Sequence, residues 1–216
     1  MRVLVGCEES QVVTKAFRKN GHEAYSCDIQ ECSGGHPEWH IQGSVLEQLD
    51  KGWDLFIAHP PCTHISVSGA AWFEEKIKDG RQQEGIDFFM KMINAPIDKI
   101  AVENPVCIMS SVYRRADQII QPYYFGDEFQ KTTCLWLKGL KQLVHVPEGD
   151  MFDKCTHVGK GEMKEGIGKD GKKWRMAAWY DDARSKGGGK ERSKTFLGIA
   201  QAMADQWGED RLNANA

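Results

Sequence analysis

The sequence predicts a doubly wound, mostly parallel α/β sheet that carries a small basic, glycine-rich insertion near its C-terminal end. The first observation is the alternation of strand and helix signals through the first hundred residues. The second is the length of 216 residues, which is ample for one buried core. The third is the charge distribution: the net charge is −3, yet residues 154–194 hold 12 Lys or Arg against 6 Asp or Glu, together with 8 Gly. We therefore expect one α/β domain with a basic appendage.

The expected strands are short runs of apolar and β-branched residues that end in glycine or polar residues. Strand–helix–strand units pair in parallel through right-handed crossovers, so the carboxyl ends should lie along one sheet edge, where ligands bind. The runs before the pattern changes near residue 118 are 2–5, 22–27, 41–43, 53–58 and 99–103. Apolar residues at helical spacing predict helices at 12–17, 85–93 and 195–207. Two further strands, open to a hairpin arrangement, are expected at 123–126 and 132–137.

The composition limits the class of protein. Apolar residues make up 41% of the chain and charged residues 27%, which is typical of a globular fold. No apolar run approaches the roughly 18–20 residues of a membrane helix, and the N-terminus becomes polar within a few residues. We expect a cytoplasmic protein with no membrane partner. Its predicted parts are a core at residues 1–139, the basic insertion at 140–191 and a C-terminal helix at 192–216 that returns to the core.

Seven cysteines are irregularly spaced and include no C-x-x-C pair. This pattern argues against a disulfide framework and against a zinc ribbon. Cys155 and His157, with His145 nearby, could ligate a metal, but no second cysteine pair completes such a site. We expect free thiols and no metal, which leaves the question of whether one thiol is chemically special.

Cys62 is the thiol in the most constrained setting. Pro60 and Pro61 precede it directly, after an expected buried strand. Two prolines fix the backbone and remove two amide donors, so the turn that carries the thiol is stiff. A stiff turn at the carboxyl end of a strand is what a positioned nucleophile requires. His59 and His64 flank this thiol, either tuning it or serving as hydrogen-bonded structural residues.

Glu103 and Asn104 end the next expected strand, which one crossover should place beside the first. A carboxylate raises the pKa of a neighbouring thiol, so Glu103 is a poor activator of Cys62. It is well suited to protonate or hydrogen-bond a ring nitrogen while sulfur attacks a nearby carbon. The pair therefore indicates nucleophilic attack on an electron-poor heterocycle.

Pro60-Pro61-Cys62 followed by Glu103-Asn104 resembles the Pro-Cys and Glu-Asn motifs of the DNA (cytosine-5-)-methyltransferases. Nearly the whole chain resembles a small, often phage-borne version of that family. The resemblance implies a Rossmann-like, class I S-adenosylmethionine-dependent fold, in the host cytoplasm if the protein is phage-encoded. It also implies that Cys62 adds to carbon 6 of a cytosine flipped out of DNA, while Glu103 contacts ring nitrogen 3 and the amino group. Carbon 5 then takes methyl from S-adenosylmethionine, and Cys62 is eliminated.

The same resemblance assigns roles to weaker motifs. Asn104 would steady the loop, and Lys131 stands for a basic family residue beside the flipped base. Asp28 would bind the ribose hydroxyls of the cofactor. Ser44 lies where the family usually has an aspartate that contacts the adenine amino group. The residues expected to line the cofactor pocket are Gly6, Cys7, Glu8, Asp28, Ser44, Pro60 and Thr195.

The basic stretch is the part available for target recognition. Lys172, Lys173 and Arg175 beside Trp174 offer phosphate contacts and a stacking surface, so we expect DNA as the partner. Alternatives remain open: the same chemistry on RNA or on a free pyrimidine nucleotide, donation of a group other than methyl, or a catalytically silent binding protein.

Overall fold

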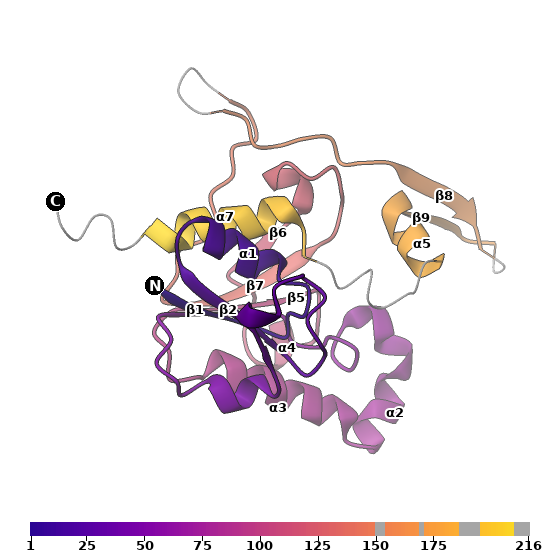
Figure 1. Ribbon diagram of the computed structural model, residues 1–216. Helices are drawn as coiled ribbons and strands as arrows, with labels where there is room; N and C mark the ends of the chain where they lie inside the picture. Colours follow the sequence, from indigo (N-terminus) through magenta and orange to yellow (C-terminus); the bar gives the residue numbers. More distant parts are fainter. Residues whose placement is uncertain (150–153, 169–170, 186–194, 210–216) are drawn as a thin grey trace. The chain divides into compact units, whose positions relative to one another are not determined.

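The computed structural model describes residues 1–149, 154–168, 171–185 and 195–209 (Figure 1). Backbone contacts divide the chain into two compact units. The first comprises residues 1–120, 132–143 and 200–216, and the second comprises residues 121–131 and 144–199.

A seven-stranded sheet of order β3-β2-β1-β4-β5-β7-β6 forms the centre of the first unit. Strands β1 to β5 are mutually parallel where they pair, whereas β7 runs antiparallel to both β5 and β6. The predicted doubly wound, mostly parallel sheet is thereby confirmed. The strands are β1 (Arg2–Gly6), β2 (Glu23–Asp28), β3 (His40–Gln42), β4 (Leu55–Ala58), β5 (Ile100–Asn104), β6 (Gln118–Ile120) and β7 (Thr133–Lys138).

Helices cover both faces of this sheet. Figure 1 shows α1 (Val12–Lys19) and α7 (Leu197–Gly208) on one face and α3 (Arg81–Ile93) on the opposite one. Phe89 of α3 is fully buried, and its ring meets that of Trp136 of β7 edge to face, with 5.1 Å between centroids. The central strands are buried on both sides, which explains their continuous apolar runs.

Short helical elements connect these larger ones. The helical segments are α2 (Phe73–Lys78) and α4 (Met109–Val112). The 3-10 turns are η1 (Pro37–Trp39), η2 (Val45–Gln48) and η3 (Val67–Trp72).

The second unit contains the turn η4 (Pro122–Phe125), an antiparallel hairpin of β8 (Met163–Ile167) and β9 (Lys173–Ala177), and helix α5 (Ala178–Ser185). The strand predicted at 123–126 is wrong. Pro122 begins a 3-10 turn there, and Gly126 ends it with a φ of 92°. The short strand that pairs with β7 is β6, which precedes this turn.

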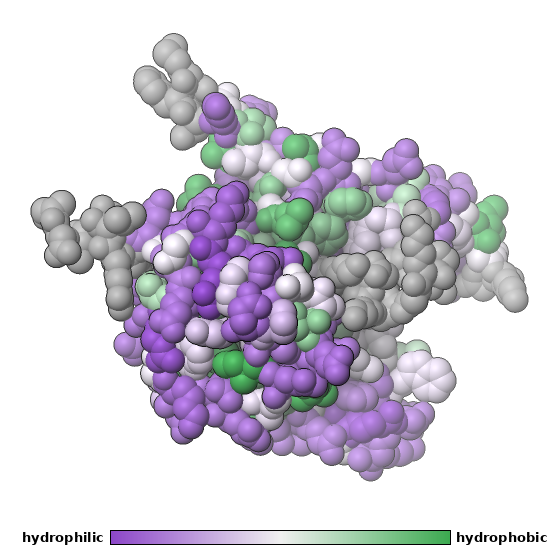
Figure 2. Space-filling model, in the orientation of Figure 1, coloured by the Kyte–Doolittle hydropathy of each residue, from purple (hydrophilic) through white to green (hydrophobic). Residues whose placement is uncertain are grey.

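Large hydrophobic side chains are exposed at separate places on the described surface. In the view of Figure 2, they form small groups within a mostly hydrophilic face. Among the described helices, none is long and apolar enough to cross a bilayer.

Candidate active site

The strand register brings four polar turns to one edge of the sheet. Gly6, at the end of β1, pairs with Cys27 of β2 on one side and with Ala58 of β4 on the other. Ala58 in turn pairs with Val102 of β5. The residues that follow these positions therefore lie at the same carboxyl edge, as the crossover argument predicts.

The Pro-Pro-Cys turn is fixed by backbone hydrogen bonds. The amide of His59 donates to the carbonyl of Gly6 at 2.9 Å, which fixes the start of the turn. The carbonyl of Cys62 accepts from the amides of Ile65 at 3.1 Å and Ser66 at 2.8 Å, which makes one helical turn beginning at the thiol residue. Pro60 is buried, and Cys62 is partly exposed. A ligand at the edge could therefore reach a thiol held on ordered backbone.

A second set of contacts ties this turn to the segment after β5. The amide of Val67 donates to the carbonyl of Val106 at 3.1 Å, and the amide of Ile108 donates to the carbonyl of Ile65 at 3.0 Å. On the other side, the Lys76 ammonium donates to the carbonyl of Thr63 at 2.7 Å, and this lysine is only 7% exposed. Lys76 was not predicted, because no sequence pattern marks a lysine whose ammonium donates to a carbonyl of this turn.

Asn104 links the two motifs directly. Its Nδ2 donates to the backbone carbonyl of Pro60 at 2.9 Å and to the backbone carbonyl of Glu103 at 3.2 Å. The residue is 1% exposed, and its Oδ1 has no hydrogen-bond partner among the described residues. The geometry therefore couples the position of the Pro-Pro-Cys turn to the end of β5.

Glu103 is buried at this junction and meets a histidine. Its Oε2 lies 2.7 Å from Nδ1 of His59, and the two side chains are 9% and 11% exposed respectively. Because a carboxylate oxygen only accepts, Nδ1 of His59 is the donor of this hydrogen bond. The sequence had left His59 open between a tuning and a structural role, and the structure places it against the predicted acid.

Two more thiols lie near this cluster but differ from Cys62. Burial raises the pKa of Cys107 to about 11, with smaller contributions from Cys134 and Cys62. Burial also raises the pKa of Cys134 to about 11, and Glu103 adds to this rise. Since the thiolate is the nucleophile, both thiols are poorly suited to attack at neutral pH.

The first turn of the sheet is shaped by packing and by unusual backbone. A Cβ on Gly6 would lie 2.6 Å from Cγ2 of Val45 and 2.8 Å from Cε2 of Phe56, so only glycine fits there. Cys7 has a φ of 59°, in the left-handed region that non-glycine residues rarely adopt. Burial, Asp28 and Cys27 together raise the pKa of Cys7 to about 12. Its backbone conformation, rather than a reactive thiol, is what Cys7 contributes to the edge.

The side chain of Glu8 forms hydrogen bonds at the start of α1. Its carboxylate accepts from the amide of Val13 at 2.6 Å and from the hydroxyl of Thr14 at 2.7 Å. Burial raises its pKa, an effect countered in part by nearby His59 and by these hydrogen bonds. Glu8 therefore supports the first turn from below, with its oxygens already engaged.

Asp28 and Ser44 follow the neighbouring strands β2 and β3. Oδ1 of Asp28 accepts from the amide of Gln30 at 2.8 Å, and the carboxylate remains partly exposed. Ile29, directly after it, is 76% exposed, which is unusual for an isoleucine beside a sheet edge. Ser44 precedes η2, and its side chain makes no capping hydrogen bond to that turn. The pair offers a carboxylate and a hydroxyl with an apolar side chain beside them.

Lys131 and Thr195 both lie in the second unit. The ammonium of Lys131 lies 5.9 Å from the ring centroid of Phe196, within cation–π distance. Thr195 is half-buried, while the rest of its predicted motif, residues 192–194, lies outside the described residues.

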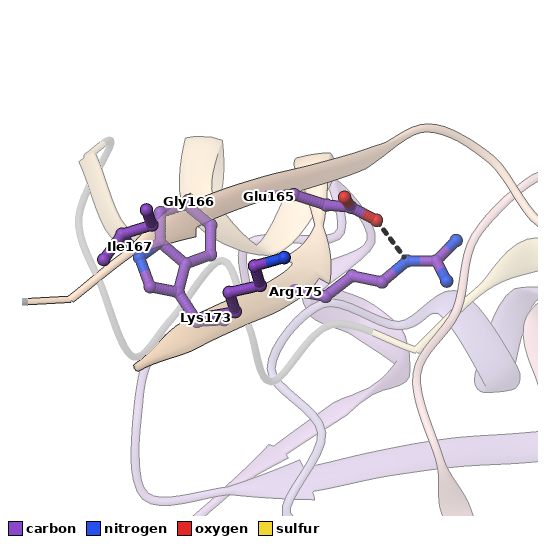
Figure 3. Close-up of a pocket in the computed structure, with 6 residues that line it drawn as sticks. Glu165, Gly166, Ile167, Lys173 and Arg175 are labelled. Carbon is purple, nitrogen blue, oxygen red and sulfur yellow. Dashed lines mark ion pairs between the residues drawn. The ribbon is translucent and has the colours of Figure 1, made fainter. Parts of the chain in front are cut away.

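The basic residues predicted to contact DNA lie at the start of strand β9. Lys172, Lys173 and Arg175 are exposed, and Nε of Arg175 lies 3.1 Å from the carboxylate of Glu165 in an exposed ion pair. Trp174 pairs with Gly166 across the hairpin, and both line the pocket drawn in Figure 3 together with Ile167. A Cβ at Gly166 would lie 2.5 Å from that indole, so glycine allows the ring to lie close to the opposite strand. Trp174 nevertheless remains 39% exposed.

The histidines considered as metal ligands form an aromatic cluster instead. Nδ1 of His145 lies 2.7 Å from Nε2 of His157, and the ring of Tyr124 stacks on both. The Cys155 thiol donates to the carbonyl of Pro147 at 3.1 Å. Within the described ranges, no group of three or more His, Cys, Asp or Glu side chains is arranged to hold a metal ion.

Comparison with known proteins finds similarity among solved structures. No family model matches the chain, and no curated protein matches it. Among solved structures, it is similar to a candidate DNA modification methyltransferase encoded within a prophage of E. coli. The sequences are 14% identical and the TM-score is 0.44; the match covers 63% of this chain and 46% of the other. The chain thus spans about half the length of that protein.

Proposed function

We propose that this protein transfers a methyl group from S-adenosylmethionine to carbon 5 of cytosine in DNA, through a covalent adduct with Cys62. The observation that carries the proposal is the hydrogen bond from Asn104 to the carbonyl of Pro60, which joins a Pro-Pro-Cys turn to a Glu-Asn strand end. This contact joins the turn that carries a partly exposed thiol to the strand end that carries a buried carboxyl group. A nucleophile and an acid acting on the same heterocycle need that arrangement.

The proposed addition begins with the thiolate of Cys62, whose proton goes to solvent. Its sulfur forms a bond to carbon 6 of cytosine, and the ring electrons move toward nitrogen 3. Glu103 gives its proton to that nitrogen, which leaves carbon 5 electron-rich and Glu103 as a carboxylate. After carbon 5 has gained methyl and lost its own proton to solvent, the sulfur–carbon bond breaks. The electron pair returns to Cys62, and the proton on nitrogen 3 returns to Glu103.

The residues at the ends of β1 to β3 fit a nucleoside cofactor. Asp28 presents a partly exposed carboxylate for ribose hydroxyls, and exposed Ile29 offers an apolar surface for a purine ring. The hydroxyl of Ser44, which does not cap η2, can hydrogen-bond to the base. S-adenosylmethionine supplies the methyl group when bound. The roles proposed for Gly6, Cys7 and Pro60 are to shape the backbone of this pocket.

The remaining proposed contacts belong to DNA. Lys172, Lys173 and Arg175 supply phosphate contacts, and partly exposed Trp174 supplies a stacking surface. Lys131 is proposed to face the flipped base, and Thr195 to close the cofactor pocket. A cytosine inside a duplex must leave the stack before a thiol can reach carbon 6, so base flipping is part of the proposal.

Nucleoside mass spectrometry tests the reaction in one experiment. DNA and RNA are isolated from cells that lack cytosine methylation and express the wild type, Cys62→Ala or Cys155→Ala. We expect 5-methylcytosine in the DNA with the wild type and with Cys155→Ala, whose thiol is exposed elsewhere, and none with Cys62→Ala. The methylated base in RNA alone would contradict the DNA substrate. Methylation that survives Cys62→Ala would contradict the covalent mechanism.

A further inference from the structure

The side chains of His59 and Glu103 form a buried hydrogen-bonded pair. The 2.7 Å separation of Nδ1 and Oε2 is a short hydrogen bond, and both side chains are about nine-tenths buried. His59 precedes the Pro-Pro-Cys turn directly, and its own amide is fixed to the carbonyl of Gly6. The imidazole is therefore carried by the same backbone segment that carries the nucleophile.

We propose that His59 is the positioning residue of Glu103, an inference that rests on the proposed cytosine chemistry. By donating to Oε2, His59 orients the carboxyl group of Glu103, and the proton that goes to nitrogen 3 is carried on Oε1. When Oε1 releases that proton, Glu103 becomes a carboxylate, and the hydrogen bond from Nδ1 stabilises the new charge on Oε2. The proton returns to Oε1 when the sulfur–carbon bond breaks, so His59 neither gains nor loses a proton over the cycle.

The charged surroundings of the pair favour this role. Glu103 faces His59 from β5, and Glu8 lies near enough from the turn after β1 for His59 to oppose the burial that raises the pKa of Glu8. From β7, Cys134 faces Glu103 with a thiol that burial keeps protonated at neutral pH. Among the described residues, Glu103 contacts the imidazole directly, whereas Glu8 interacts with it through charge.

Two nearly isosteric variants separate positioning from general structure. His59→Asn keeps a donor close to the place of Nδ1, whereas His59→Leu removes it. At saturating DNA and cofactor, we expect His59→Leu to lower kcat by roughly 10–100-fold with little change in KM, because a positioned acid contributes about 10²–10⁴-fold. His59→Asn should retain most of kcat but follow a pH profile altered on its acidic side, because an imidazole can gain a proton at acidic pH and an amide cannot. Combined with Glu103→Gln, His59→Leu should cause no further loss.

The outcomes divide clearly. Wild-type kcat in His59→Leu, equal losses in the Leu and Asn variants, or losses that multiply in the double variant would each overturn the positioning role. If His59→Leu does not fold, the pH profile of His59→Asn decides, and a profile identical to that of the wild type would overturn the role. If the wild type itself transfers no methyl to cytosine, the proposed function fails and takes this inference with it.

Discussion

Removing the amide of Asn104 should loosen the turn that carries Cys62. Asn104 is 1% exposed, and its Nδ2 donates to the carbonyl of Pro60 at 2.9 Å. In Asn104→Ala, that carbonyl loses its donor inside the protein. In Asn104→Asp, nearly the same shape is kept, but an oxygen replaces the donor and faces the Pro60 oxygen.

The expected loss of stability depends on which buried polar groups each substitution leaves without a hydrogen bond. An unsatisfied buried carbonyl costs about 1–3 kcal/mol. In Asn104→Ala, part of this cost is offset because Oδ1, which has no partner among the described residues, is removed as well. We therefore expect a loss of about 1–2 kcal/mol in the free energy of unfolding for the alanine variant. Asn104→Asp should lose more, because it also buries a carboxylate against a carbonyl oxygen and near Glu103.

Urea denaturation and single-turnover methyl transfer check this order. A displacement of about 1 Å at a reacting group can cost on the order of 100-fold in rate, so both variants should react more slowly than their remaining stability explains. Asn94→Ala, at the exposed end of α3, is the matched control and should stay within about 0.5 kcal/mol of the wild type. An aspartate variant as stable and as fast as the wild type would refute the reasoning.

The other predictions concern thiols, backbone packing and pH. Burial raises the pKa of four thiols to about 11 or 12: Cys7, Cys27, Cys107 and Cys134. At pH 8, iodoacetamide should therefore modify Cys62 and Cys155 well before these four. Equal labelling rates would contradict this expectation. Gly198→Ala should lower the melting temperature, because a Cβ there would collide with the carbonyl oxygen of Phe125, and an unchanged thermal melt would show that this turn can move. Burial raises the pKa of Glu8, so its contribution to stability is complete below the unfolded value of about 4.3 and is lost as pH rises through the folded value. Urea denaturation at pH 5 and pH 7.5 should therefore show a smaller fall in Glu8→Gln than in the wild type, whereas equal falls would contradict the assignment.

Periodicity and strand ends were sufficient to predict the sheet. The alternation of apolar runs located β1, β2, β4 and β5 to within a few residues, because strands buried on both faces need continuous apolar sequence. Parallel crossovers then fixed which turns share an edge, before any side-chain contact was known. The predicted neighbourhood of Cys62 and Glu103 follows from this topology alone.

Predictions from local composition were wrong or missing where turn residues or contacts between distant residues determine the structure. The aromatic run 123–125 has the propensity of a strand, but Pro122 and Gly126 enclose it in a 3-10 turn. The buried position of Lys76 depends on a carbonyl 13 residues earlier, which no sequence period encodes. The hydrogen bond from the amide of Val13 in α1 to the Glu8 carboxylate was also not predicted. An acidic residue just before a helix start was the sequence signal that could have indicated it.

The first turn, at the edge where a cofactor is proposed to bind, is poor in glycine apart from Gly6. If many glycines were required for nucleotide binding, this sequence would argue against a nucleotide-binding turn. What a ligand needs at a strand end is close backbone approach, and Cys7 adopts the left-handed conformation that glycine normally supplies. Such a conformation costs about 1–3 kcal/mol and persists only where the surroundings enforce it. Here the amide of Cys7 donates to the carbonyl of Cys27 at 2.7 Å, and Gly6 lets Val45 and Phe56 pack directly beneath. The strain is therefore held in place by β2 and the core, beside the Asp28 carboxylate at which the cofactor is proposed to bind.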